Sequence, residues 1–131
     1  LIRGVIIPKL SKGKNIILDR YWYSTYAYQG SNGASKKIIE QVSKIAVDSL
    51  KPDLIIFYNL DPKIGMKRKA GNKDSDRYDV KKVNFHDKVR RSYKELRKKI
   101  GKTWNVIDAS KSIEEVHQET LKLLKKYKMI K

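Results

Sequence analysis

The chain has 131 residues and a strongly basic composition, with 31 Lys and Arg against 14 Asp and Glu and a formal net charge of +17. This length fits one domain that buries a core of its own. The absence of cysteine excludes disulfides and thiolate metal sites. No apolar run approaches the length of a membrane span and no signal peptide is expected, so a membrane is not predicted as a partner.

The net charge leaves two interpretations open. Polyanions such as nucleotides or nucleic acid are favoured partners of a protein this basic. A lysine-rich surface can also reflect genome composition or heat adaptation. The lysines are scattered along the chain rather than gathered in blocks, which favours the second interpretation.

The first predicted element is a helix over residues 1–10, LIRGVIIPKL. Apolar residues recur there at close to helical spacing, and Ser11-Lys12-Gly13 supplies a stop. The chain begins with Leu1 rather than Met, inside this helix, so we expect a piece of a longer protein.

A short apolar run at residues 16–18, Ile-Ile-Leu, predicts a buried parallel strand. Asp19 and Arg20 follow at its carboxyl end, the edge of an open α/β sheet where ligands bind. A carboxylate there can hold a metal ion through water, and an arginine offers a planar fork that fits phosphate oxygens. An Asp-Arg pair after a strand is common, however, and does not by itself indicate catalysis.

Five aromatic residues lie between residues 21 and 28, with Ser24 and Thr25 among them. Ring faces and hydroxyls are what a planar base and its sugar need for recognition, although such a cluster can also be core. The string DRY followed by S-T-x-A-Y-Q-G resembles the signature of the thymidylate kinase family. In that family this stretch holds dTMP against the phosphate donor.

A helix is predicted over residues 35–50, with Ser35 as N-cap and an apolar stripe that we expect to be core. Residues 54–60 then read as a second buried strand. Asp61 is predicted to cap the next helix, with Pro62 at its first position. The run PDLIIFYNLDP resembles a strand of nucleoside monophosphate kinases, and alternating strands and helices indicate a parallel sheet built from crossover units.

Residues 66–79 are the most polar and least periodic part of the chain. Taken alone, they predict a solvated loop. Beside the preceding strand, they resemble the lid of the family, at about residues 67–79, and the resemblance implies ATP-side roles for Arg68, Lys73 and Arg77. A cationic lid supplies electrostatic stabilisation and excludes water. Here Asp79 replaces the usual glutamate, and lysines stand where some members carry arginine.

The rest of the chain predicts a helix over residues 80–100, a third strand at residues 104–108 and a final helix. Arg90, on the first of these helices, faces either the lid or solvent. Ser112 and Glu115 form a capping box that opens the final helix. These segments also resemble the family, in which the loop after the last strand lines the adenine pocket through backbone atoms.

The resemblance covers nearly the whole chain and matches the carboxyl-terminal two thirds of a thymidylate kinase. It implies one partial domain over 1–131, with a P-loop nucleoside monophosphate kinase-like parallel α/β sheet flanked by helices and three strands visible. No G-x-x-x-x-G-K-[ST] loop occurs in the sequence, and that loop cradles the donor phosphates. We therefore expect the first βαβ unit to be missing from this chain and the chain alone to be inactive.

The function that the resemblance implies is transfer of the γ-phosphoryl group of ATP to dTMP, giving dTDP and ADP for dTTP synthesis. Mg²⁺ is the expected cofactor, held through water by Asp19, and Arg20 would bridge the acceptor phosphate and the transferring group. Tyr28 would lie against the sugar and discriminate against a 2′-hydroxyl. The remaining dTMP-binding residues, at the thymine base or near the phosphate, are Ser24, Thr25 and Gln29. The family also implies a homodimer in the cytoplasm.

Two alternatives stay open. One is another nucleoside or nucleotide kinase, although deoxynucleoside kinases tend to carry E-R-S where this chain has DRY. The other is a non-catalytic basic module that binds nucleic acid, which would gather lysines on one face and bind with a steep salt dependence. Nucleic acid is not the partner that we expect.

Overall fold

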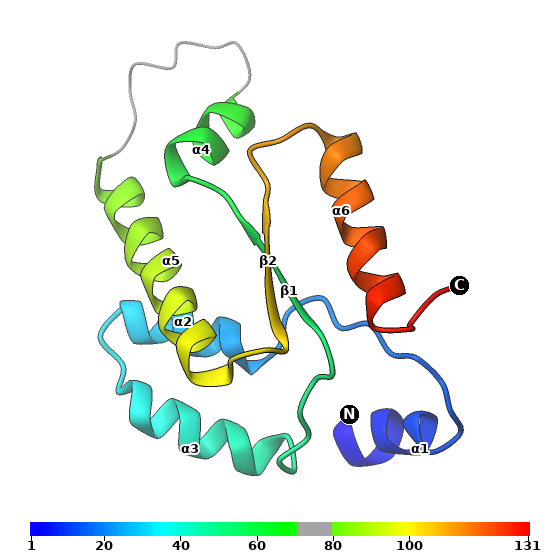
Figure 1. The fold of residues 1–131 in the computed structure, drawn as a ribbon. Helices are drawn as coiled ribbons and strands as arrows, with labels where there is room; N and C mark the ends of the chain where they lie inside the picture. Colours follow the sequence, from blue (N-terminus) through cyan, green and yellow to red (C-terminus); the bar gives the residue numbers. More distant parts are fainter. Residues whose placement is uncertain (71–79) are drawn as a thin grey trace. The chain divides into compact units, whose positions relative to one another are not determined.

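A computed structural model describes residues 1–70 and 80–131 of the chain (Figure 1). The chain divides into two compact units, Leu1–Pro52 and Asp53–Lys131. The prediction that the chain forms one partial domain stays a prediction.

The first unit opens with a helix, as the apolar spacing predicts. A π-helical turn, η1 (Ile2–Ile6), runs directly into α1 (Ile7–Leu10). Pro8 lies in the first turn of α1, directly after the π-helical turn, and because proline has no N–H one hydrogen bond to that turn is missing. Gly13 then turns the chain out of the helix with a φ of 70°, a conformation that glycine adopts without strain.

The prediction of a strand at residues 16–18 is wrong. These residues have no strand conformation, and the side chain of Ile17 is 90% exposed. Within residues 1–70 and 80–131, the only strands are β1 (Ile55–Asn59) and β2 (Trp104–Asp108), which pair with each other. A β-branched run becomes a strand only where a neighbour completes its hydrogen-bond ladder, and residues 16–18 have no such neighbour here. The prediction of three strands is therefore corrected to two in the part of the chain that the structure describes.

Two further helices complete the first unit, α2 (Trp22–Ser31) and α3 (Lys36–Ala46). Ser35 caps α3 as predicted, its hydroxyl accepting a hydrogen bond from the Ile38 amide at 3.4 Å. The helix ends at Ala46, four residues before the predicted end. Asp48 and Ser49 adopt left-handed φ angles of 54° and 57°, so the backbone leaves the helical region before Leu50.

The apolar stripe of α3 is not core, contrary to the prediction. Its side chains are exposed by 59% at Ile38, 58% at Val42 and 81% at Ile45. Helical spacing predicts which residues share a face, but burial depends on whether another element covers that face.

The second unit is a parallel strand pair with a helical crossover. β1 and β2 run in register from Ile55 opposite Trp104 to Asn59 opposite Asp108. The crossover consists of α4 (Pro62–Ala70) and α5 (Val80–Ile100). These observations confirm the predicted parallel crossover unit. The loop predicted at residues 66–79 is partly wrong, because residues 66–70 belong to α4. The rest of that segment lies outside the described residues.

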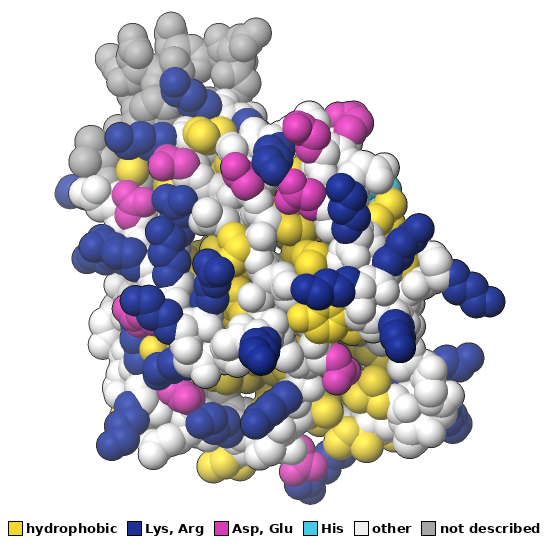
Figure 2. All heavy atoms as spheres, in the orientation of Figure 1, with side chains coloured by type: hydrophobic (Ala, Val, Ile, Leu, Met, Phe, Trp, Pro, Cys, Tyr) yellow, Lys and Arg dark blue, Asp and Glu magenta, His cyan; other side chains and the backbone are white. Residues whose placement is uncertain are grey.

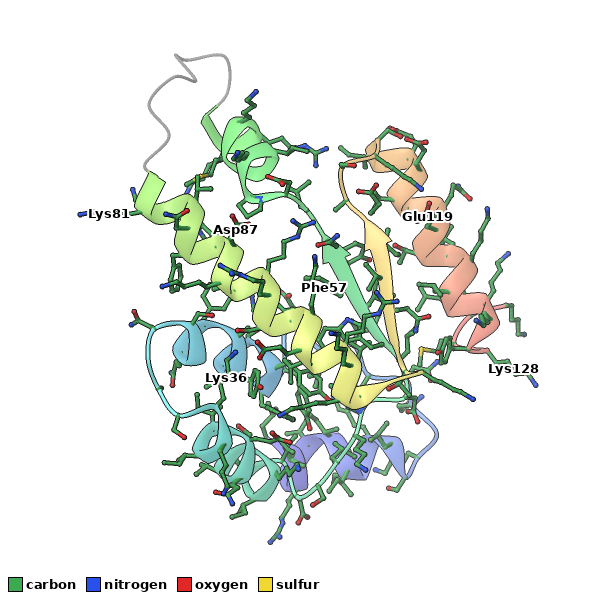
Figure 3. All side chains as sticks on the ribbon, turned by 60° about the vertical axis from the view of Figure 1, so that its left-hand side comes forward. Lys36, Phe57, Lys81, Asp87, Glu119 and Lys128 are labelled. Carbon is green, nitrogen blue, oxygen red and sulfur yellow. The ribbon has the colours of Figure 1, made fainter. Side chains whose placement is uncertain are left out.

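Helices cover both faces of the strand pair (Figure 1). On one face, the ring centroid of Phe57 lies 5.0 Å from that of Tyr93 of α5 and 5.9 Å from that of Trp104 of β2. Phe57 itself is labelled in Figure 3. On the other face, α6 (Ile113–Lys126) contributes Thr120, whose hydroxyl lies 3.0 Å from the hydroxyl of Tyr58. Successive strand residues alternate between the faces. Asn59 and Asp108, the last residues of the strands, therefore share the face of Phe57 and α5.

The core of the second unit includes Leu96 and Ile107, each 1% exposed. α6 begins with the predicted capping box, in which Ser112 and Glu115 each bond the other's backbone amide. Among the described residues, no helix is both long and apolar enough to cross a membrane.

Candidate active site

The first predicted site residues lie where the chain turns into α2. Arg20 has a φ of 70°, the left-handed conformation that is uncommon for residues other than glycine. Tyr21 is extended, and α2 begins at Trp22. Strained backbone of this kind costs about 1–3 kcal/mol and is concentrated at functional sites. The turn fixes where the Arg20 side chain leaves the backbone.

The predicted acceptor residues share one face of α2. At 3.6 residues per turn, Ser24, Thr25, Tyr28 and Gln29 span an arc of about 140°. Thr25 and Gln29 are exposed, and Ser24 and Tyr28 are half-buried. This face is open, as a binding face must be.

The other face of α2 is buried, and it takes part of the aromatic cluster with it. Tyr23, Tyr26 and Ala27 are 8%, 2% and 0% exposed. Burial raises the pKa of the Tyr23 phenol to about 12, with a smaller contribution from Tyr21. The aromatic residues between positions 21 and 28 therefore do not form one stacking surface. Tyr23 and Tyr26 lie in the core, and Tyr28 lies on the open face.

Asp19 and Arg20 are both exposed. The guanidinium carbon of Arg20 lies over the Tyr28 ring, 5.4 Å from its centroid. Within the described part of the chain, Asp19 has no hydrogen bond or ion pair. Its carboxylate is thus not committed to holding this part of the fold together.

The described residues contain no group of three or more His, Asp or Glu side chains that could hold a metal ion. Mg²⁺ does not require such a group, because it keeps several waters and is bound through one or two carboxylates and substrate phosphates. A single open carboxylate such as Asp19 fits that mode of binding.

The second set of candidate residues lies at the carboxyl ends of β1 and β2, in the second unit. The amide of Ala109 donates a hydrogen bond to the Asn59 carbonyl at 3.0 Å, so the loop after β2 is held against the end of β1. Ligands of open α/β sheets bind outside this edge.

Arg68, on the last turns of α4, reaches this loop. Its two terminal nitrogens donate hydrogen bonds to the carbonyls of Ala109 at 2.8 Å and Ser110 at 3.0 Å. The structure thereby brings together two elements that the resemblance assigned separately to the ATP side, the lid arginine and the loop after the last strand. The other two predicted lid residues, Lys73 and Arg77, lie outside the described residues.

Asp108 fixes the shape of the same loop. Its carboxylate accepts hydrogen bonds from the Ser110 amide at 2.9 Å and the Ser110 hydroxyl at 2.7 Å. These bonds lower the pKa of Asp108. Sequence reasoning missed Asp108 and Ser110, although polar residues directly after a buried strand are the signal that marks a binding edge.

Arg90 faces the end of β1, which is neither of the two predicted orientations, the lid and solvent. Its Nε donates to the Asn59 side-chain carbonyl at 2.8 Å, and one terminal nitrogen lies 3.8 Å from the Asp61 carboxylate. Asp61 also accepts a hydrogen bond from the Lys63 amide at 2.8 Å, as the predicted N-cap of α4. Arg90 therefore links α5 to the start of α4.

A parallel strand pair with helices on both faces and charged side chains at its carboxyl edge is typical of α/β proteins that bind nucleotides or phosphates. The sequence profile of thymidylate kinases matches residues 1–120. The chain belongs to the thymidylate kinase family.

Curated relatives cover most of this chain. The thymidylate kinase of Geobacillus thermodenitrificans (strain NG80-2) is 34% identical over 119 residues, which are 88% of this chain and 53% of the relative. That of Shewanella sp. (strain MR-4) is 36% identical over 124 residues, 95% of this chain and 59% of the relative. That of Thermoanaerobacter sp. (strain X514) is 34% identical over 128 residues, 97% of this chain and 63% of the relative. The chain thus spans between half and two thirds of their length.

Proposed function

We propose that the protein acts as a thymidylate kinase, transferring the γ-phosphoryl group of ATP to dTMP. The observation that carries this proposal is that α2 has one open face and one buried face, in a chain that belongs to the thymidylate kinase family. The residues of the S-T-x-A-Y-Q-G string that would meet the nucleotide lie on the open face, whereas Tyr26 and Ala27 of the same string are buried.

On the acceptor side, Arg20 would bind the dTMP phosphate and the group in transfer, where a planar fork can make two parallel hydrogen bonds. Tyr28 would lie against the sugar. The residues proposed for the base or the phosphate surroundings are Ser24, Thr25 and Gln29.

On the donor side, Arg68 and the loop after β2 would receive ATP. Arg68 is exposed and already contacts the backbone of that loop, which supports a shared role. Lys73 and Arg77 are proposed as further cations of the lid, from the sequence alone.

Asp19 would hold Mg²⁺ through water. When bound, the ion neutralises charge on the phosphates and orients them. A homodimer and a cytoplasmic location are proposed from the family alone.

A nucleic-acid-binding module is the competing function. Figure 2 shows Lys and Arg side chains spread over the face in view, with Asp and Glu among them. This distribution favours a solvated basic surface over a concentrated polyanion-binding patch, although the net charge of +17 keeps weak electrostatic binding of nucleic acid possible.

The test compares nucleotides on one preparation. We expect dTMP to raise the melting temperature more than dCMP, dGMP or dAMP at equal concentration, because a ligand that binds the folded state more tightly stabilises it more. Gln29→Ala should reduce the dTMP effect. Gln41→Ala, at an exposed position of α3, is the matched control and should not.

Phosphoryl transfer is followed in parallel on the complete enzyme, as conversion of dTMP to dTDP in the presence of ATP and Mg²⁺, because the chain alone is expected to be inactive. Equal temperature shifts with all four nucleotides, together with binding of single-stranded DNA that falls steeply with salt, would contradict the kinase proposal and favour the alternative.

A further inference from the structure

We propose that Tyr28 is a positioning residue for Arg20, holding its guanidinium over the open face of α2 so that the N–H groups meet the acceptor phosphate. This inference rests on the proposed function, which supplies the phosphate. It gives Tyr28 a role that acts through Arg20, beyond contact with the sugar.

Arg20 lies two residues before the start of α2. It has a φ of 70° and lies between a segment that is neither helix nor strand and the extended Tyr21. Tyr28 lies six residues inside α2, about 9 Å along the helix axis from Trp22. An extended arginine side chain that leaves the backbone before the helix can cover most of that distance if it runs along the helix surface.

The direction of helical side chains brings Tyr28 toward Arg20. Cα–Cβ bonds in an α-helix tilt toward its N-terminus, so a side chain covers the turn that precedes it. The Tyr28 ring therefore leans toward the start of α2, over the turn that carries Ser24. The 5.4 Å between the Arg20 guanidinium carbon and the ring centroid is within the range of cation–π attraction.

An aromatic face suits this role better than a carboxylate. A carboxylate partner would occupy the N–H donors of the guanidinium, which are the groups that bind phosphate. A ring attracts the guanidinium through its face and leaves the donors at the edge available. Among the described residues, no carboxylate forms an ion pair with Arg20, so the ring supplies the contact that orients it.

The first arm of the test observes Arg20 without any nucleotide. The ring current shifts the Nε–H proton of an arginine that lies over a ring upfield in an NMR spectrum. The signal of Arg20 is assigned as the one that is missing in Arg20→Lys. Tyr28→Leu should move the signal downfield, to the position of an exposed arginine. Tyr28→Phe, which keeps the ring, should leave it shifted. An unchanged signal in Tyr28→Leu, with helix content retained by circular dichroism, would overturn the inference.

The second arm separates contact with the phosphate from contact with the sugar. Calorimetric titrations compare dTMP with thymidine, which has the same base and sugar but no phosphate. Because Tyr28 also lies against the sugar in the proposed site, Tyr28→Leu should weaken both ligands, but dTMP about threefold more than thymidine, the size of one exposed cation–π contact. Tyr28→Phe should restore the affinity for dTMP. Equal weakening of both ligands would place Tyr28 at the sugar alone and overturn its positioning role.

These two experiments distinguish a failure of the inference about Tyr28 from a failure of the proposed function. If the unmodified protein binds neither dTMP nor thymidine, the proposed function is contradicted, and the NMR comparison alone decides whether Tyr28 positions Arg20.

Discussion

The starts of α2 and α4 have similar sequences but are held in different ways. Each helix follows an apolar run and an aspartate, Asp19 before α2 and Asp61 before α4. Asp61 caps its helix by accepting the Lys63 amide. α2 has no side-chain cap; instead, the Tyr21 hydroxyl donates to the Leu50 carbonyl at 2.9 Å and Tyr23 is buried. Because aromatic side chains anchor α2, Asp19 is not needed for the fold and remains available to a ligand.

The arginines of the two regions differ in the same way. The donors of Arg90 are directed at Asn59 and Asp61, whereas Arg20 lies over a ring. Arg90 thus stabilises the arrangement of α4 and α5, and Arg20 presents its donors outward. The same residue type therefore has a structural role in one region and a proposed functional role in the other.

The largest expected effect tests whether the apolar run at residues 16–18 differs in burial from a strand of the second unit. Ile107→Ala in β2 should lower the free energy of unfolding by about 2–5 kcal/mol, because it removes a fully buried side chain and leaves a cavity. Ile17→Ala, at a side chain that is 90% exposed, should change it by less than about 0.5 kcal/mol. Chemical denaturation of both variants measures this difference. A similar loss in both would mean that residues 16–18 are buried after all.

The next effect tests the two arginines. Arg20→Lys in the complete enzyme keeps the charge but removes the planar fork, and should lower kcat by about two orders of magnitude, or roughly 3 kcal/mol, the size of one lost preorganised donor. The KM for dTMP should rise much less, since the base and sugar contacts remain. Arg90→Lys is the matched control and should lower the melting temperature while kcat stays within about threefold. A kcat for Arg20→Lys within threefold of the unmodified protein would remove Arg20 from catalysis.

The sequence predicted correctly those elements whose signals are local. β2 occupies the predicted residues, and the capping box of Ser112 and Glu115 forms as expected. A cap needs only residues one turn apart. A crossover with long helices likewise implies parallel pairing of the strands at its two ends.

The errors concern features that depend on neighbours distant in sequence. Residues 16–18 have the composition of a strand but no ladder partner among the described residues, and the stripe of α3 has the period of a core face but is exposed. At the candidate site, periodicity predicts which residues of α2 share a face. The contacts of Arg68 with the loop after β2, and of Arg90 with Asn59, join residues more than 30 positions apart, so no local pattern could show them.

A smaller effect tests the cap of α4 against the uncapped start of α2. Asp61→Ala should cost about 1 kcal/mol of stability, the usual value for a lost N-cap, and Asp61→Asn should recover most of it because asparagine caps equally well. Asp19→Ala should leave stability nearly unchanged. Thermal unfolding of the three variants, read by circular dichroism, compares them. A loss at Asp19 as large as that at Asp61 would contradict the view that its carboxylate is uncommitted.

The last prediction concerns the aromatic anchor of α2 and is spectroscopic. Burial raises the pKa of Tyr23 to about 12, from an ordinary value of 10.0, because the phenolate would lose its hydration. In the unfolded chain Tyr23 ionises near its ordinary pKa, whereas in the folded chain it keeps its proton. Its contribution to stability is therefore complete below about pH 10 and falls as the pH rises toward 12. Ultraviolet absorbance of tyrosinate should show a late-titrating group that Tyr23→Phe removes. If Tyr23→Phe instead removes a group that titrates near pH 10, the ring is not buried, and the start of α2 requires another anchor.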